Sequence, residues 1–249
     1  MREINLGFPL IKLNSVDSTN NYASRLLRQE AVAEGTVILA VHQTRGKGQG
    51  GTSWESEEDR NLLLSLILRP EFIPAGKQFY LSMSIANGIV EFIASHVDGA
   101  RIKWPNDIYI EGKKVSGILI ENTIMSQNLH TSIVGIGLNV NQREFSSDLP
   151  NPTSLNLATG REYDLDETLM LLLKHLQVNI GRFYREAYGE IKTTYLNNLW
   201  LINKWALFTD DSGEFEGRIA DVAETGELVV TKRDGRTVHY DFKEITFHI

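Results

Sequence analysis

The chain has 249 residues, of which 42% are hydrophobic and 23% charged, and its formal net charge is −7. This length and composition fit a globular protein with one large domain and a small one, and the negative charge excludes a general nucleic-acid binder held by excess positive charge. The sequence contains no cysteine, which excludes disulfides, thiolate metal sites and a cysteine nucleophile.

Helices and strands alternate through the first part of the chain. In chain order we expect a capped helix over 14–27, a buried strand over 36–41, a glycine-rich loop over 44–51, a second buried strand over 61–68 and a helix over 79–93. Asp17 and Ser18 are the N-cap candidates of the first helix.

A run of shorter strands follows. We expect strands over 102–104 and 108–110, interrupted by Pro105, and then strands over 115–120 and 132–140. Glu111-Gly112 is expected to form a tight turn.

Two helices followed by a set of short strands complete the chain. Asp164 and Glu167 form a capping-box pattern that begins a long helix ending near Tyr184, and a second helix runs to about residue 200. Short strands are then expected over 205–208, 214–220, 227–231 and 237–242. The sequence therefore predicts an α+β domain over 1–200 and a small β-barrel or sandwich over 201–249.

The glycine-rich loop matches G-x-G-x-x-G at Gly46 to Gly51, but its context is not that of a dinucleotide fold. The residues after it lack an apolar helical stripe, and the next strand follows too soon for a crossover helix. No Gly-Lys-Ser/Thr closes the loop, which excludes a Walker motif. Its glycines and the cations Arg45 and Lys47 can cradle an anion, although a flexible surface loop would have the same composition.

Two further clusters carry polar side chains. Lys103-Trp104-Pro105-Asn106-Asp107 is followed by Lys114, Gly117 and Glu121, a set that can bind a carboxylate or phosphate and help bind Mg²⁺. An exposed hairpin with surface charges is the alternative. Gly135-Ile136-Gly137-Leu138-Asn139 suggests the floor of a pocket, or a bulge or close strand crossing.

Taken in order, these motifs resemble biotin–protein ligase. The resemblance rests on Asp17-Ser18-Thr19-Asn20, then Gln43-Thr44 with the glycine loop and Trp54, and then the two clusters just described. It covers nearly the whole chain. It implies a mixed sheet with flanking helices like that of class II aminoacyl-tRNA synthetases. It also implies two reactions: biotin and ATP form biotinyl-5′-AMP, and a lysine of a biotin carboxyl carrier protein then attacks the acyl carbon.

The resemblance also implies roles for individual residues. Lys114, Lys47 and Asp107 would be catalytic, with Lys114 contacting the reacting carboxylate and α-phosphate. Biotin would be bound by Ser18, Thr19, Asn20, Gln43, Gly46, Lys47, Gly48, Gln49, Lys114, Gly117 and Gly137. ATP would be bound by Gln49, Trp54, Lys103, Asn106, Asp107 and Asn139, and Asp107 would also serve Mg²⁺.

The chain departs from the family pattern in its loop and its N-terminus. Lys47 and Gln49 stand where the commonest family loop has arginines, a departure that bears most on retention of the adenylate. The chain begins close to Ser18, which leaves no room for an N-terminal winged helix, so we expect a ligase without DNA binding. It is expected to be a monomer or a homodimer.

Three alternative functions are a lipoate–protein ligase, an octanoyltransferase of the same superfamily and a non-catalytic biotin-binding regulator. A lipoate–protein ligase matches the loop and the Lys103–Asp107 motif poorly, and an octanoyltransferase would need a cysteine. A non-catalytic biotin-binding regulator would be expected to lose Lys114 or Asp107. The sequence shows neither a secretory signal nor the roughly 20 apolar residues that span a bilayer, so we expect a cytoplasmic protein without membrane contact.

Overall fold

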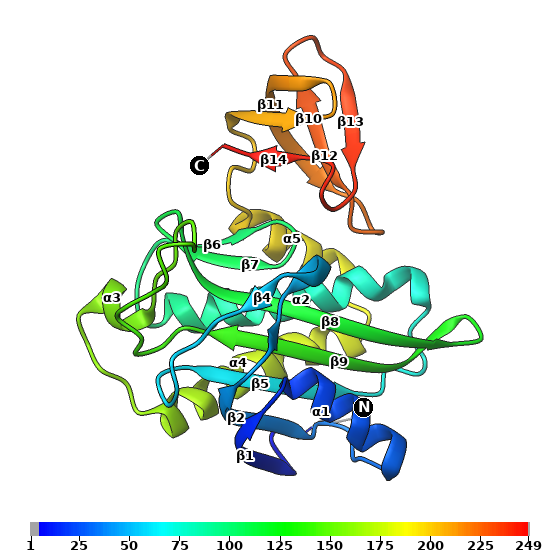
Figure 1. Ribbon diagram of the computed structural model, residues 1–249. Helices are drawn as coiled ribbons and strands as arrows, with labels where there is room; N and C mark the ends of the chain where they lie inside the picture. The colour runs from blue at the N-terminus through cyan, green and yellow to red at the C-terminus, as the bar shows by residue number, and fades with distance from the viewer. Residues whose placement is uncertain (1–4, 249) are drawn as a thin grey trace.

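The computed structural model describes residues 5–248, and a seven-stranded mixed sheet forms its centre (Figure 1). The strand order is β1-β2-β5-β9-β8-β7-β6; the β1–β2 pair is parallel and its other neighbours pair antiparallel. The strands are β1 (Leu10–Val16), β2 (Val37–Gln43), β5 (Leu62–Leu68), β6 (Ala100–Lys103), β7 (Asp107–Ile110), β8 (Lys113–Met125) and β9 (Asn128–Leu138).

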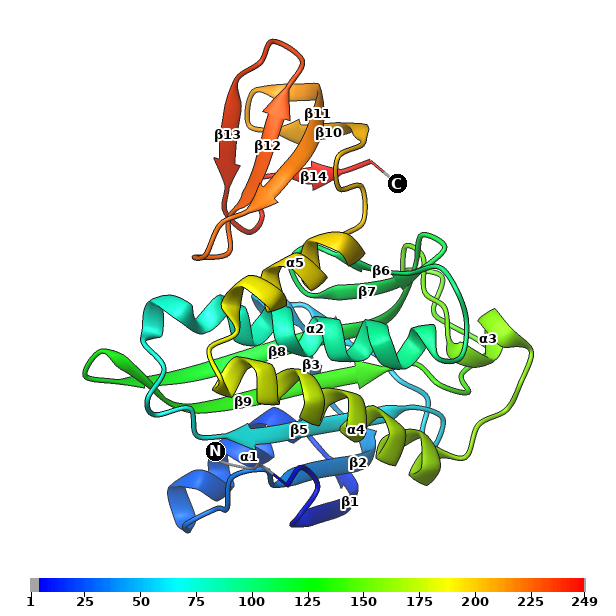
Figure 2. The ribbon, with the colours of Figure 1, turned by 180° about the vertical axis from the view of Figure 1, so that it is seen from behind.

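Helices cover both faces of this sheet. In Figure 1, α1 (Thr19–Gln29) lies in front of it, whereas α2 (Gln78–Ala94), α4 (Leu165–Tyr184) and α5 (Tyr188–Asn198) cover the opposite face, seen from the front in Figure 2. The short helix α3 (Leu155–Thr159) follows the loop after β9. The predicted α+β fold, a mixed sheet with flanking helices, is confirmed. None of the helices in residues 5–248 is long and apolar enough to cross a membrane.

The buried strands and the long helices form as the sequence predicts. All seven residues of β5 are buried, because helices pack on both of its faces. Asp164 is the N-cap of α4, and its side chain accepts a hydrogen bond from the backbone N–H of Glu167. Glu111 and Gly112 both have positive φ and make the expected turn between β7 and β8.

The N-terminal part differs from the prediction in two ways. Residues 14–16 belong to the edge strand β1, and the helix begins only at Thr19. The loop over 44–51 is partly ordered as a small hairpin, in which β3 (Gly46–Lys47) pairs with β4 (Ser53–Trp54) around a 3-10 turn at Gln49–Gly51. We call residues 46–54 the glycine hairpin. A second 3-10 turn, at Ala75–Lys77, precedes α2.

The last part of the chain is a five-stranded antiparallel sheet of order β13-β12-β11-β10-β14, formed by β10 (Trp205–Asp210), β11 (Gly213–Val222), β12 (Leu228–Lys232), β13 (Thr237–Tyr240) and β14 (Thr246–Phe247). The order ends at β13 and β14, so the sheet is open there rather than a fully hydrogen-bonded barrel. It contacts the larger part through Trp104, whose Nε1 donates to Gly226 O at 2.8 Å, and through Tyr80, whose hydroxyl donates to Glu224 at 3.1 Å.

Candidate functional site

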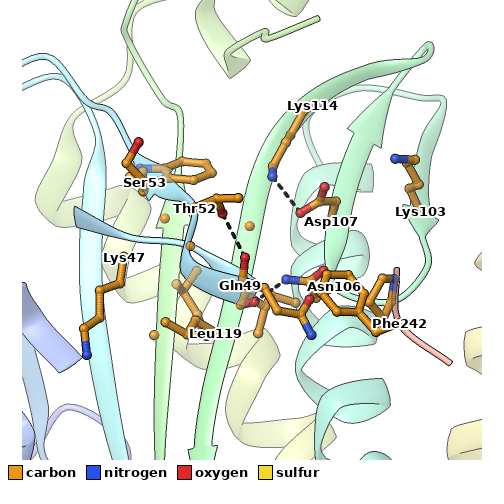
Figure 3. A pocket seen from close by; sticks show the side chains of 18 of the residues that line it. Lys47, Gln49, Thr52, Ser53, Lys103, Asn106, Asp107, Lys114, Leu119 and Phe242 are labelled. Carbon is orange, nitrogen blue, oxygen red and sulfur yellow. Dashed lines mark hydrogen bonds and ion pairs between the residues drawn. The ribbon is translucent and has the colours of Figure 1, made fainter. Parts of the chain in front are cut away.

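A cavity of about 400 Å³ opens on the face of the sheet that carries α1 and the glycine hairpin (Figure 3). The N-terminus of α1 lies at one end and the turn between β6 and β7 at the other, with the chain segment before β14 along the rim. Of the predicted site residues, the cavity is lined by Ser18, Thr19, Asn20, Gln43, Lys47, Gly48, Gln49, Trp54, Lys103, Asn106, Asp107, Lys114, Gly117 and Gly137. The structure therefore brings together segments that lie far apart in the sequence.

One end of the cavity is neutral and hydrogen-bonding. Ser18 occupies the N-cap position of α1, yet its hydroxyl makes no capping bond to the described backbone. Gln43 Oε1 instead accepts the backbone N–H of Thr19 at 2.7 Å. Ser18, Thr19 and Asn20 are each at most 3% exposed. These neutral donors and acceptors suit a compact, uncharged polar group, because an apolar group would gain no hydrogen bond from them.

The glycines of the hairpin allow its two strands to approach each other closely. A Cβ at Gly46 would lie 2.3 Å from Trp54 O, and one at Gly48 would lie 2.4 Å from Thr52 Oγ1. Gly46 is buried within the hairpin and does not line the cavity. Lys47 extends from the hairpin, and its Nζ is 3.5 Å from Glu121 Oε1.

Trp54 lies flat against two glycines of the sheet. A Cβ at Gly117 in β8 would be 2.9 Å from Trp54 Cζ3, and one at Gly137 in β9 would be 2.4 Å from Trp54 Cε2. Gly117 and Gly137 are paired across the β8–β9 ladder, so their missing side chains leave one flat platform for the indole. The Trp54 Nε1 is buried without a hydrogen-bond partner in residues 5–248.

The other end of the cavity is cationic. Lys114 Nζ is 2.7 Å from Asp107 Oδ1, and Figure 3 shows the two side chains pointing toward each other, with Lys103 beyond Asp107. Antiparallel pairing of β6, β7 and β8 brings the three residues together. Burial lowers the pKa of Lys103, while the charge of Asp107 raises it and that of Lys114 lowers it. Two cations and one carboxylate leave a net positive charge, which suits an anion.

A second cavity of about 220 Å³ continues from this cationic end and shares Trp54, Lys103, Asp107 and Lys114 with the first. Asn139 lines this second cavity and not the first; its Nδ2 donates to Thr153 O at 2.9 Å. Its Oδ1 is buried and has no hydrogen-bond partner in the described part of the chain. An unpaired amide oxygen beside an indole can accept a hydrogen bond from a planar heterocyclic ligand.

The chemistry of the cationic end fits a metal ion only as one carried by a ligand. No group of three or more His, Cys, Asp or Glu side chains that could hold a metal occurs among residues 5–248. Asp107 is a single carboxylate paired with Lys114. Mg²⁺ bound by phosphates and water needs only one or two protein carboxylates, so Asp107 fits that role.

Several residues in or next to the cavity were not predicted from the sequence. Phe242, Lys243 and Phe247 line the first cavity from the C-terminal part, and nothing in their local sequence points to a site more than a hundred residues away. Ser65 lies behind Thr19 and hydrogen-bonds to it. The sequence does offer one signal for Ser65, because it is the single polar residue in an otherwise apolar strand.

Comparison with known proteins gives one consistent result. The model of the biotin/lipoate A/B protein ligase family matches residues 13–139. The bifunctional ligase/repressor BirA of Bacillus subtilis is 32% identical over 92% of this chain and 71% of its own length. A biotin–[acetyl-CoA-carboxylase] ligase of Mycobacterium tuberculosis is 27% identical over 91% of this chain and 85% of its own. The structure of the Aquifex aeolicus biotin protein ligase in complex with biotin and ATP matches with a TM-score of 0.78 and 30% identity, covering 96% of this chain and 98% of that one.

Proposed function

Because the chain belongs to the biotin/lipoate A/B protein ligase family, we propose that its cavity is the active site of an ATP-dependent biotin–protein ligase. The enzyme forms biotinyl-5′-AMP and pyrophosphate from biotin and ATP, and then transfers biotin to a lysine of a carrier protein. One observation carries the proposal: a single cavity joins a neutral hydrogen-bonding end to a cationic end. Biotin has the same polarity, with an uncharged ureido ring at one end and a carboxylate at the other.

The neutral end binds the biotin head group. Ser18, Thr19, Asn20 and Gln43 offer hydroxyl and amide groups to the ureido ring, and the glycine hairpin covers the bicyclic ring. This arrangement favours biotin over lipoate. A dithiolane ring has no N–H group, so it gains no hydrogen bond from these side chains, which already pair with one another in the free protein.

The cationic end activates the carboxylate. A carboxylate resists nucleophiles, and adenylation gives it a good leaving group. Lys114 lies where it can contact both the carboxylate oxygen and the α-phosphate, so it holds two anions together and stabilises the negative charge that develops at phosphorus. Asp107 positions Lys114 through their ion pair, and Lys103 neutralises phosphate charge.

ATP occupies the second cavity and the part shared with the first. Trp54 and Asn139 lie beside the adenine, and Gln49 and Asn106 contribute from the hairpin and from the turn between β6 and β7. Asp107 would hold a Mg²⁺ ion that accompanies ATP, and the ion would supply positive charge that neutralises the phosphates.

The partner of the second reaction is a biotin carboxyl carrier domain of a biotin-dependent carboxylase. The acceptor lysine attacks the acyl carbon of the adenylate, and AMP leaves with the electrons of the broken acyl–phosphate bond. The same proposal places the enzyme in the cytoplasm, as a monomer or a homodimer without nucleic-acid or membrane contact.

The test is labelling of a purified carrier domain, with its acceptor Lys→Arg variant as the matched control. With ATP, Mg²⁺ and biotin, the intact carrier should gain one biotinyl group by mass spectrometry, whereas the variant should gain none. Labelling of the carrier by lipoate and not by biotin would contradict the proposal and move the chain to the lipoate branch of its family.

A further inference from the structure

A serine lies in the middle of an otherwise apolar, buried strand. Ser65 has only leucine and isoleucine neighbours in β5 and is fully buried. Its Oγ is 2.7 Å from Thr19 Oγ1 and 2.6 Å from Asn20 Oδ1. Thr19 and Asn20 line the neutral end of the cavity, whereas Ser65 lies behind them and does not line it. Any effect of Ser65 on a ligand is therefore exerted through these two side chains.

Glu121 anchors the other side of Asn20. The Asn20 Nδ2 is 2.8 Å from Glu121 Oε2 and 3.4 Å from Leu119 O. Both of these oxygens only accept, so the amide nitrogen must face them and the Asn20 Oδ1 must face Ser65. The carboxylate thus fixes the orientation of the amide, since a flipped amide would place two acceptors against each other.

The hydroxyl protons follow from counting donors. Ser65 has one proton and must donate it to Asn20 Oδ1, which cannot donate. The 2.7 Å contact between Ser65 and Thr19 then needs the Thr19 proton, because two oxygens at that distance with no proton between them repel. Gln43 Oε1 already accepts the backbone N–H of Thr19 at 2.7 Å, and the Thr19 hydroxyl lies 3.1 Å from it. The single Thr19 hydroxyl proton cannot serve both contacts, and we assign it to the shorter one, with Ser65.

All protons in this set therefore point the same way, from Thr19 through Ser65 and Asn20 to the carboxylate of Glu121. We call these four side chains the relay. The Thr19 hydroxyl presents lone pairs, and not its proton, to the cavity. A chain of hydrogen bonds that ends on a charged acceptor is strengthened along its length.

We propose that Ser65 and Glu121 are positioning residues that hold the Thr19 hydroxyl as an acceptor for a ureido N–H of biotin. This inference rests on the proposed function, because it assigns a determinant of head-group recognition within the same site. A ureido ring offers two N–H donors, and an acceptor fixed in advance binds one of them without reorganisation. A ring without N–H groups gains nothing from it, so the relay contributes to the choice of biotin.

Lys47 contacts the relay at Glu121, its charged end. Its Nζ is 3.5 Å from the second oxygen of Glu121, and both side chains are 42% exposed. An ion pair this exposed and this long adds little free energy. The relay therefore predicts that Glu121 acts chiefly through Asn20, and only weakly through the glycine hairpin.

Calorimetric titration with biotin alone, together with pyrophosphate-exchange kinetics, tests the inference in the full-length protein. Ser65→Ala should weaken biotin binding about tenfold, the effect of losing roughly one well-placed hydrogen bond. The KM for biotin should rise in parallel while the KM for ATP and kcat stay within about twofold. Glu121→Ala should weaken biotin binding similarly, and Glu121→Gln should recover most of the affinity, because its amide oxygen can accept from Asn20.

Ser84→Ala is the matched control. Ser84 in α2 is also fully buried, and its Oγ has no hydrogen-bond partner in residues 5–248, so the variant removes the same atom without touching the relay. It should bind biotin like the wild type. Equal affinities for Ser65→Ala and Ser84→Ala, or a Glu121→Gln variant as weak as Glu121→Ala, would overturn the relay while leaving the ligase function in place. A wild-type protein that binds no biotin would overturn both.

Discussion

At the scale of single residues, Lys103 has a charge that a bound anion would change. Burial lowers the pKa of its ammonium group in the free protein. The unfolded chain therefore holds the proton to higher pH than the folded one, so Lys103 makes stability rise with pH between its lowered pKa and its ordinary value. An ATP phosphate beside Lys103 favours the charged form and raises the pKa again.

The first prediction follows from this sign. ATP binding should be accompanied by proton uptake between the lowered pKa of free Lys103 and the ordinary value of 10.5, where the phosphates are fully ionised, and affinity should fall as pH rises through the pKa of free Lys103. Calorimetry in two buffers of different ionisation enthalpy measures the uptake. Lys103→Met should abolish it, and Lys113→Met, at an exposed position at the start of β8, should not. Undiminished uptake in Lys103→Met would contradict the assignment.

Lys114 carries a second prediction at this scale. Lys114→Ala should lower the rate of adenylate formation at least about 100-fold, the cost of removing one preorganised charge from a reacting centre. Its side chain is 34% exposed and its ion pair with Asp107 is partly solvated, so the melting temperature should change little. The rate of biotinyl-5′-AMP formation in a quenched single-turnover experiment tests this prediction. A variant that forms adenylate at the wild-type rate would remove Lys114 from the mechanism.

At the scale of elements, the sequence predicts the elements with strong periodicity and misses those that depend on partners. The all-apolar strand over 62–68 and the capped helix after Asp164 form as expected. The strand β1 was not predicted, because it is a half-exposed edge strand whose Asn14 and Ser15 favour a helix cap or turn. Pairing with β2 stabilises it, and that partner lies more than twenty residues away.

The glycine hairpin likewise combines features that the local sequence predicts with features that depend on distant residues. The sequence indicates an anion-binding loop, and the structure adds that Gly117 and Gly137 form the platform beneath Trp54. The local sequence around Gly137 predicted the floor of a pocket, but it could not show which side chain covers that floor. The indole is the missing part, and it comes from a different pair of strands.

A third prediction tests the platform. Gly137→Ala would place a methyl group 2.4 Å from a rigid indole ring, so Trp54 must move. The KM for ATP should rise about tenfold, the cost expected of an overpacked contact. Gly76→Ala is the control, since a Cβ at Gly76 would meet nothing within 4 Å. Replacing Trp54 by Leu in the Gly137→Ala background should not weaken ATP binding further, and an additive loss would refute the shared contact.

At the scale of the whole molecule, the C-terminal part completes the site from outside. Lys243, in a left-handed conformation with φ of 77°, donates from Nζ to Gly50 O at 3.0 Å. This bond joins the segment before β14 to the tip of the glycine hairpin. Composition and strand spacing predicted a separate small β unit over 201–249, and the boundary at residue 200 stays a prediction. Its contribution to the cavity arises only in the folded molecule.

The fourth prediction concerns this bond. Lys243→Ala should loosen the glycine hairpin and release biotinyl-5′-AMP several-fold faster, because one exposed charge-assisted hydrogen bond is lost. Biotin binding should change less than adenylate release, since the proposed head-group site lies away from the tip of the hairpin. Stopped-flow release of the adenylate measures the effect, with Lys204→Ala, at an exposed position outside the site, as the control. Equal release rates for the two variants would contradict a closing role for the C-terminal segment.

The central claim is that one cavity activates biotin, and it is tested most directly by ATP–pyrophosphate exchange with biotin, lipoate or octanoate as the only acid. Exchange should depend on ATP and Mg²⁺ and be supported by biotin alone, because of the three acids only biotin has N–H groups to donate to the proposed acceptors around Thr19. Exchange with lipoate or octanoate and not with biotin, or no exchange with any of the three, would contradict it.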